Sequence, residues 1–319
     1  MMRLPSYAMP TPAPLGRQAV AAGIGPIAIR ALRPGARGSV RAVFERCFYV
    51  ELESGWACIG PEDLGAGPLN LVCARWPAGP LRAHVCCGEV AEIDAGMLLA
   101  GHLAIALGEA APWLPERVGH WDKASLGRGL AATDVALRAL APRDGLALLS
   151  GEDGFFRPAL LSSREDPLAH LEQLLAEQRA VEPPPIDVAR IAPLLGLGPG
   201  LTPSGDDYLG GLLVALSLVG RSVVRDRLWQ ALHPLTIGRT TAISRAHLAA
   251  AAEGLGSAAL HHALGAILSG ATEKIATACA GLAKVGHTSG WDALAGALSV
   301  LRAHTCGHLE FALLGRDWG

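Results

Sequence analysis

The amino-acid sequence predicts an α+β protein in which a β-rich N-terminal region with added helices precedes a mainly helical C-terminal region. Short runs rich in β-branched and aromatic residues, separated by turn residues, fill residues 39–88. After three consecutive prolines at 183–185, nearly every segment has the apolar spacing of a helix. The 319 residues, of which 50% are hydrophobic and 18% charged, are enough for about two domains with their own cores.

Charge and composition exclude several classes of protein. Lys and Arg number 27 against 29 Asp and Glu, a net charge of −2, so no basic surface for nucleic acid is expected. The longest apolar run covers only 208–219, shorter than the roughly 20 residues that cross a bilayer as a helix. Prolines interrupt the N-terminus before a signal sequence can form, and the seven cysteines include no CxxC pair. We therefore expect a cytoplasmic protein with reduced cysteines, whose apolar composition also allows a homo-oligomer.

The expected domain boundaries follow changes in composition. Residues 1–37, rich in Pro, Ala and Gly, are predicted to be a loosely ordered leader. Residues 38–181 are assigned to a β-rich α+β domain, and residues 182–187 (EPPPID) to a stiff linker. Residues 188–319 are assigned to the mainly helical domain.

Within the first domain the elements are expected in the following order. Strands are predicted at 46–52, 56–60, 68–73 and 82–87. A helix with Asp94 as its N-cap is predicted through Glu109, and a second helix over 121–140. A hairpin around the GEDG turn is predicted over 145–162, followed by a helix over 166–177.

The most informative segment is GLGPGLTPSGDDYLGGLLVAL at 196–216, in which a glycine-rich loop leads into a helix. Two alternatives remain open for the helix start. Either Thr202 caps it with Pro203 at the first position, or Ser204 caps it with Asp207 three residues later. In both cases free amides lie beside Asp206 and Asp207.

A second segment, GHTSGWDALAGALSVL at 286–301, repeats the pattern SGxDxLxGxLxxL at an offset of 85 positions. Ser204, Gly205 and Asp207 correspond to Ser289, Gly290 and Asp292; upstream, Gly196 and Leu197 correspond to Gly281 and Leu282 at the same offset. We predict a duplicated loop-helix element whose two helix ends converge on a shared, donor-rich hollow able to bind an anion. The alternative is two well-capped buried helices without a site.

Further polar residues lie between and around these motifs. On a helix, Thr240, Ser244 and His247 form one polar ridge, with Thr241 beside it, and this ridge either faces the hollow or is a seam between helices. His287 directly precedes the second helix start and is the preferred general acid or base, since imidazole titrates near neutral pH. Its alternative role is to fix the turn.

With GLGPGLTPSGDD, TTAIS and GHTSGWDALAG in this order, the sequence resembles a bacterial family long described as a domain of unknown function. The family is typified by AllH, a subunit of oxamate carbamoyltransferase in allantoin (purine) catabolism. The resemblance implies carbamoyl transfer between carbamoyl phosphate and oxamate, and companion enzyme subunits. A non-catalytic metabolite-binding or scaffolding subunit and a stand-alone Mg²⁺-dependent hydrolase are the alternatives.

The resemblance also implies roles for the residues of the motifs. Backbone amides and hydroxyl groups are expected to bind a small anionic metabolite such as carbamoyl phosphate or oxamate, and His287 is expected to transfer protons. Asp206, Asp207 and Asp292 are expected to orient an amine or amide, or to bind Mg²⁺ through Asp206 and Asp207; no other cofactor is implied. The full set of expected substrate-binding residues is Gly198, Gly200, Thr202, Ser204, Gly205, Thr240, Thr241, Ser244, Thr288, Ser289, Gly290 and Trp291.

Overall fold

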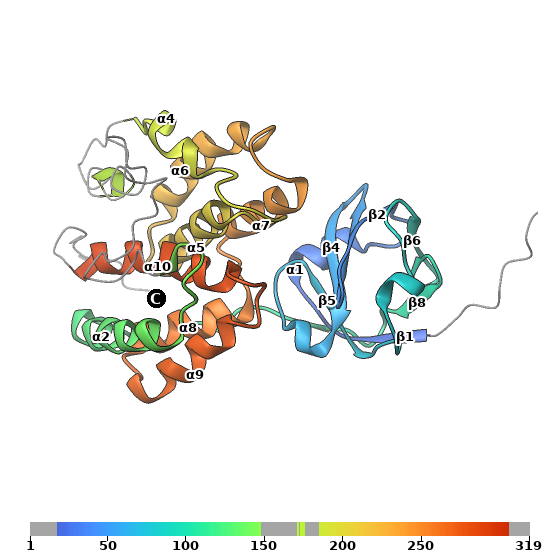
Figure 1. Ribbon diagram of the computed structural model, residues 1–319, viewed down its shortest axis with the longest axis horizontal. Helices are drawn as coiled ribbons and strands as arrows, with labels where there is room; N and C mark the ends of the chain where they lie inside the picture. Colours follow the sequence, from blue (N-terminus) through green and yellow to red (C-terminus); the bar gives the residue numbers. More distant parts are fainter. Residues whose placement is uncertain (1–17, 148–170, 172, 176–184, 306–319) are drawn as a thin grey trace, which may run out of the picture. The chain divides into compact units, whose positions relative to one another are not determined.

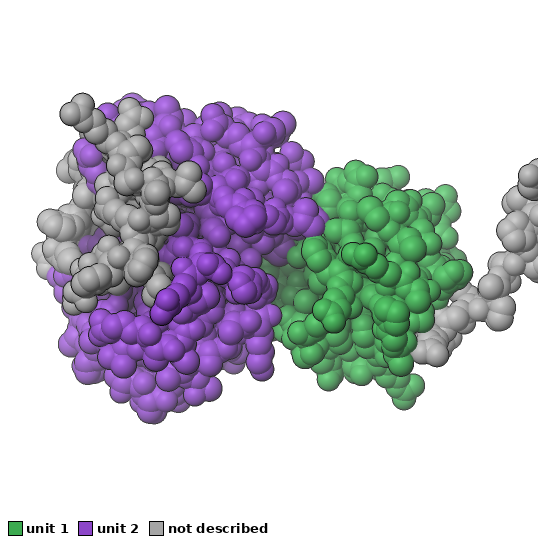
Figure 2. Space-filling view, viewed as in Figure 1, with its two compact units in different colours: residues 1–113 green, residues 114–319 purple. Residues whose placement is uncertain are grey.

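A computed structural model describes residues 18–147, 171, 173–175 and 185–305 of the chain. It divides into two compact units, Met1–Trp113 and Leu114–Gly319, which are coloured separately in Figure 2. The first unit is built from strands and the second from helices, so the predicted α+β class is confirmed.

The first unit is a single sheet that closes on itself (Figure 1). The strand order is β5-β4-β3-β2-β6-β7-β8-β1-β9, and β1 pairs in parallel with β8 and antiparallel with β5. Its described elements are β1 (Gln18–Ile24), α1 (Pro26–Ala31), β2 (Arg37–Val43), β3 (Phe48–Leu52), β4 (Gly55–Pro61), β5 (Asn70–Arg75), β6 (Val90–Asp94), β7 (Met97–Ala100), β8 (Leu103–Ala106) and β9 (Ala111–Pro112).

Alternating burial explains why these segments are strands. In β3 the side chains of Phe48, Val50 and Leu52 are buried while the residues between them are partly exposed. A period of two places one face of the strand in the core and the other toward water. Burial also alternates along β6 and β7, and the buried side chains of the strands form one apolar core.

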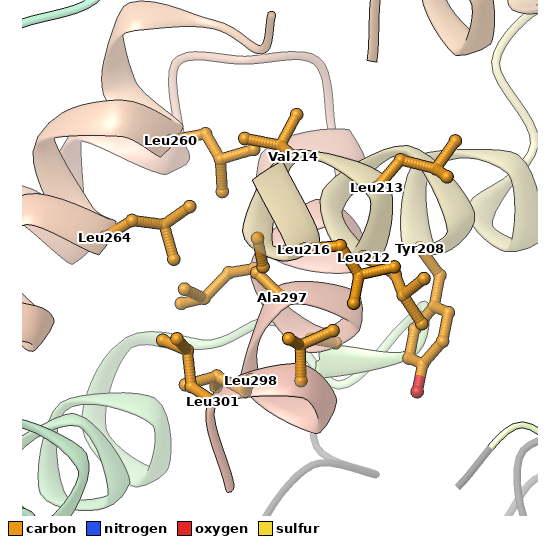
Figure 3. Packing of buried hydrophobic residues seen from close by; sticks show 14 of the residues in the cluster. Tyr208, Leu212, Leu213, Val214, Leu216, Leu260, Leu264, Ala297, Leu298 and Leu301 are labelled. Atoms are coloured by element: carbon orange, nitrogen blue, oxygen red, sulfur yellow. The ribbon is translucent and has the colours of Figure 1, made fainter. Parts of the chain in front are cut away.

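The second unit is a bundle of helices around a larger apolar core. Figure 3 shows part of this core, to which Leu212, Leu216, Leu260 and Ala297 contribute their side chains. The described helices are α2 (Lys123–Leu140), α4 (Val188–Ile191), α5 (Ser204–Leu218), α6 (Ser222–Thr236), α7 (Ala242–Ala252), α8 (Ala258–Ser269), α9 (Thr272–Leu282) and α10 (Ser289–Thr305). Among the described residues, none of the helices has both the length and the apolar character needed to cross a membrane.

Two of the predicted elements are wrong. The helix predicted over 94–109 is instead the antiparallel series β6, β7 and β8. Gly96 and Gly101 adopt positive φ angles of 77° and 56°, which reverse the chain between short apolar runs too brief for helical turns. The strand predicted over 82–87 begins within a 3₁₀ turn, Leu81–Ala83, and continues as loop. The strands expected at 46–52, 56–60 and 68–73 and the helix expected over 121–140 are confirmed within a few residues.

The division between units differs from the expected one at 182–187, because α2 belongs to the helical core. Ser125 donates a hydrogen bond to the Leu268 carbonyl at 2.9 Å, and a Cβ on Gly129 would stand 1.9 Å from the Ile267 oxygen. These contacts join α2 to α8, so the boundary lies at 113/114. The prolines at 183–185 interrupt a helix but do not separate two cores.

The expected leader at 1–37 also differs from the structure, since β1 and α1 lie within it. Strand β1 is paired on both sides and is therefore an integral part of the closed sheet. Residues 1–17 lie outside the described residues, as does most of the hairpin predicted over 145–162. Of the helix predicted over 166–177, the described residues 171 and 173–175 are helical.

Candidate functional site

Helices α5 and α10 pack against each other through glycines at corresponding positions. A Cβ on Gly211 would lie 1.7 Å from the carbonyl oxygen of Ala293, and a Cβ on Gly296 would lie 1.8 Å from that of Tyr208. Gly211 and Gly296 are 85 positions apart, as are Tyr208 and Ala293. Each helix therefore presents its glycine to the same position of the other helix, and the duplicated element forms a pseudo-two-fold pair.

The turns before the two helices also correspond, but not in the register expected from the sequence. The Gly205 amide donates to the Leu197 carbonyl, and the Gly290 amide donates to that of Val285. Leu197 and Val285 are 88 positions apart, so the loop before α5 is longer by three residues than the loop before α10. The upstream correspondence of Gly196 and Leu197 with Gly281 and Leu282 is therefore wrong, because it ignored this insertion.

The N-terminal ends of α5 and α10 meet, as the sequence predicts. The hydroxyl oxygens of Thr202 and Ser289 lie 3.1 Å apart and share a hydrogen bond. Neither predicted cap forms on α5, however: Pro203 is the N-cap residue, and no side chain accepts a bond from the first turn. The hydroxyl of Thr202 instead shares the hydrogen bond with Ser289 of the other helix end, and the hydroxyl of Ser204 hydrogen-bonds to Asp292.

The backbone amides in the first turns of α5 and α10 already donate hydrogen bonds to nearby backbone carbonyls. The Asp206 and Asp207 amides donate to the Pro203 carbonyl at 2.9 and 3.1 Å. Likewise, the Trp291 and Asp292 amides donate to the Thr288 carbonyl at 2.9 Å. Because Gly205 and Gly290 also donate to loop carbonyls, these six amides already have partners. The predicted donor-rich hollow is thus poorer in free donors than the sequence suggests.

Asp206 holds three segments together at the start of α5. Its side chain is 2% exposed, and its carboxylate accepts hydrogen bonds from the Gly196 amide at 2.9 Å, from Ser244 Oγ at 2.7 Å and from Thr240 Oγ1. Both carboxylate oxygens therefore have donors. Asp206 fixes the glycine-rich loop and α7 to the helix end.

The polar ridge predicted near α7 is only partly helical. Thr240 precedes α7, and Thr241 is its N-cap, with its hydroxyl accepting from the Ser244 amide at 3.0 Å. Thr241 also donates to the Leu201 carbonyl at 2.5 Å, which ties the first loop to this helix. Burial lowers the pKa of His247 to about 4, so its imidazole is neutral at neutral pH.

Asp207 and Asp292 are the corresponding carboxylates of the two helix ends. Asp292 is fully buried; its Oδ1 accepts from the Leu146 amide at 2.5 Å, and its Oδ2 is buried without a hydrogen-bond partner. The Oδ2 of Asp207 is likewise buried without a partner. The site thus contains two carboxylate oxygens removed from water and left unpaired, which is costly unless something else binds them.

The surroundings shift the pKa of both carboxyl groups upward. Burial raises the pKa of Asp207 well above its ordinary value, and the charges of Asp292 and Asp206 raise it further. Burial also raises the pKa of Asp292. Hydrogen bonds from serine hydroxyls oppose these shifts. Ser289 of α10 lowers the pKa of Asp207 on α5, and Ser204 of α5 lowers the pKa of Asp292 on α10. Each serine therefore serves the carboxylate of the other helix end.

Not every predicted residue lies with this pair. His287 is 84% exposed, with its Nε2 3.8 Å from an oxygen of the exposed Asp144. Trp291 is 2% exposed and belongs to the apolar core, at the position that corresponds to Asp206 in the first repeat. Gly198 and Gly200 lie on the exposed loop with φ angles of 106° and 99°. Each of the two helix ends therefore has a corresponding carboxylate and a corresponding serine hydroxyl, whereas Asp206 has no counterpart at the second helix end.

Sequence reasoning missed the segment that covers Asp292. A Cβ on Gly145 would stand 2.5 Å from Asp292 Oδ1 and 3.1 Å from its Oδ2, so the chain passes directly over this carboxylate. Gly145 has a φ of 81°, and the Leu146 amide follows it. The only available signal was the glycine itself, which the sequence analysis assigned to the start of a hairpin.

Buried carboxyl groups with raised pKa values, placed where two helix ends meet, are characteristic of enzyme subunits and ligand-binding domains more than of purely structural bundles. The family model of oxamate carbamoyltransferase subunit AllH matches residues 194–301, so the resemblance seen in the motifs is confirmed over about a third of the chain. No solved structure matches the chain.

Proposed function

We propose that the chain is an AllH-type subunit of an oxamate carbamoyltransferase and that the paired helix ends take part in carbamoyl transfer between carbamoyl phosphate and oxamate. One observation carries the proposal. The family match over residues 194–301 starts in the loop before α5 and ends within α10, so it encloses both helix ends and the α7 contacts to Asp206. The matched segment holds both helix ends and the donors to Asp206, while the Leu146 amide that contacts Asp292 lies outside it.

The reaction needs a small set of chemical groups. The amide nitrogen of oxamate attacks the carbamoyl carbon of carbamoyl phosphate and forms the new C–N bond. The C–O bond then breaks and phosphate leaves with its electron pair, while the nitrogen gives up a proton; the products are oxalurate and phosphate. A site for this reaction must orient the amide, stabilise the oxyanion on the carbamoyl carbon and accept the proton.

The helix ends supply groups of these kinds. The hydroxyls of Thr202, Ser204, Thr288 and Ser289 hydrogen-bond to Asp207 or Asp292, and we assign to them the contacts to a carbamoyl or phosphate oxygen of the bound substrate. The exposed Gly198–Gly200 loop lies beside them. Asp207 and Asp292 provide the acceptors. His287 is exposed beside the start of α10, where it is free to meet a substrate or a companion subunit, and we assign proton transfer to it.

The test is turnover by the complete assembly, obtained by co-expressing the chain with the proteins encoded by its neighbouring genes. Release of phosphate from carbamoyl phosphate should depend on oxamate. We expect His287→Ala to lower this turnover about 100-fold or more, since a general base contributes about that much. The matched control is His262→Ala, an exposed histidine on α8, which should leave turnover unchanged.

Two outcomes would count against parts of the proposal. Unchanged turnover in His287→Ala would remove the role of this histidine. An assembly that binds oxamate or carbamoyl phosphate by titration calorimetry but transfers no carbamoyl group would replace the enzyme assignment with a metabolite-binding or scaffolding subunit.

A further inference from the structure

The meeting point of α5 and α10 is rich in acceptors and poor in free donors. Asp207 Oδ2 and Asp292 Oδ2 are buried without hydrogen-bond partners. The amides that would turn such a place into an anion site donate to loop carbonyls instead. A buried site with unpaired carboxylate oxygens favours a positively charged ligand or a hydrogen-bond donor.

The charge at this point is also uncompensated within the part of the chain that the structure describes. Asp206 and Asp292 are 2% and 0% exposed, and the negative charges of both act on Asp207 and raise its pKa. None of the ion pairs formed by described residues includes these three aspartates. Buried charges in proteins are ordinarily paired or coordinate a metal ion.

We propose that the two helix ends bind one divalent cation, Mg²⁺, between Asp207 and Asp292, with the surrounding hydroxyl oxygens as further ligands. Asp206 is not a ligand, because both of its oxygens already accept hydrogen bonds from Gly196, Thr240 and Ser244. In this proposal Asp292 takes the place of Asp206 in the Asp206–Asp207 pair expected from the sequence. The inference rests on the proposed function only in taking the helix ends as the site.

The donor set identifies the class of cation. Two carboxylates and the hydroxyls of Thr202, Ser204, Thr288 and Ser289 are all oxygen ligands, which suit Mg²⁺ rather than Zn²⁺ or Cu²⁺. In the described ranges, no group of three or more His, Cys, Asp and Glu side chains is placed to hold a metal. Mg²⁺ does not need one, because it binds through one or two carboxylates and completes its shell with water and substrate phosphate.

A bound cation also resolves a conflict in the proposed function. Carbamoyl phosphate and oxamate are both anions, and the three aspartates would repel them. The positive ends of the two helix dipoles, about half a charge each, do not cancel three carboxylates. A divalent ion on Asp207 and Asp292 neutralises their two negative charges, and the phosphate oxygens can complete its coordination shell.

Mn²⁺ serves as the probe, because its free form is counted by electron paramagnetic resonance and it shares the ligand preference of Mg²⁺. The full chain, stripped with EDTA and desalted, should bind one Mn²⁺ that excess Mg²⁺ displaces. Asp207→Asn and Asp292→Asn should each weaken binding at least about tenfold. The control is Asp226→Asn, an exposed α6 aspartate paired with Arg225, which should bind as the wild type does.

The proposal is overturned if the wild-type chain binds no Mn²⁺, or if both Asp207→Asn and Asp292→Asn bind it as tightly as the wild type. Circular dichroism of each variant ensures that only folded chains are compared, and Asp207→Asn is expected to fold because it removes an unpaired charge. A chain that binds Mn²⁺ at this place while the assembly transfers no carbamoyl group contradicts the proposed function alone. Carbamoyl transfer by an assembly whose chain binds no Mn²⁺ contradicts the cation site alone.

Discussion

Asp207→Asn is expected to make the metal-free chain more stable and the assembled enzyme inactive. The substitution replaces a carboxylate whose Oδ2 is buried and unpaired by a neutral amide of the same shape. An unsatisfied buried polar group costs about 1–3 kcal/mol, so the variant should gain stability of that order at pH 8. Turnover should fall at least about 100-fold, because the carboxylate is lost from the site.

The gain should depend on pH in a defined direction. In the folded chain the pKa of Asp207 lies well above its ordinary value of 3.8, mainly through burial and then through the nearby Asp292 and Asp206. The stability due to this group is complete below the unfolded pKa and is lost as the pH rises through the folded pKa. Asp207→Asn removes that loss, so its advantage should vanish near pH 4 and grow toward pH 8.

Thermal unfolding in EDTA buffer from pH 4 to pH 8 measures this effect, with Asp226→Asn as the control. A gain of 1 kcal/mol corresponds to about 2–4 °C for a unit of this size. A less stable Asp207→Asn variant at pH 8, or one with full turnover, would mean that Asp207 is an ordinary structural acid.

Gly211→Ala is expected to disrupt the helical unit, although it adds a single methyl group. The new Cβ would stand 1.7 Å from the Ala293 carbonyl oxygen, and the obstacle is backbone that cannot rotate away. Helices α5 and α10 must then separate, and this loosens both the core and the joined helix ends. We expect a loss of about 3 kcal/mol or more, at the upper end for overpacked cores, and a melting temperature lower by roughly 6–12 °C.

The neighbouring Gly210 provides a matched control on the same helix. A Cβ there would meet only the Ala251 methyl group at 3.7 Å, an ordinary contact. Because alanine favours a helix over glycine by about 0.5–1 kcal/mol, Gly210→Ala should be neutral or stabilising. Equal melting temperatures for Gly211→Ala and Gly210→Ala would refute the close packing of the two helices.

The duplicated element is the part of the site that sequence alone predicts well. The Ser-Gly-x-Asp pattern and the small residues repeat at an offset of 85 positions, which can be read directly from the sequence. Such a repeat predicts two similar elements that pack against each other. The alternation of Phe48, Val50 and Leu52 likewise identifies a strand without further context. Both patterns can be recognised from residues that lie close together in the sequence.

What the sequence did not predict depends on contacts between distant segments. The donors to Asp206 come from Gly196, Thr240 and Ser244, and no local pattern shows that they exhaust its carboxylate. The Leu146 amide on Asp292 is 146 positions away. Similarly, the helix predicted over 94–109 is wrong because turns at Gly96 and Gly101, and pairing with neighbouring strands, override a helical apolar spacing.

The most direct test of the account is a disulfide between the two helix ends. Thr202 and Ser289, whose hydroxyl oxygens lie 3.1 Å apart, are replaced together as Thr202→Cys and Ser289→Cys, and the oxidised chain is mapped by mass spectrometry. The control pairs Thr202→Cys with Ser269→Cys, an exposed position on α8. The paired helix ends predict a rapid, nearly complete bond in the native chain that does not form preferentially in denaturant; a yield no higher than that of the control would contradict them.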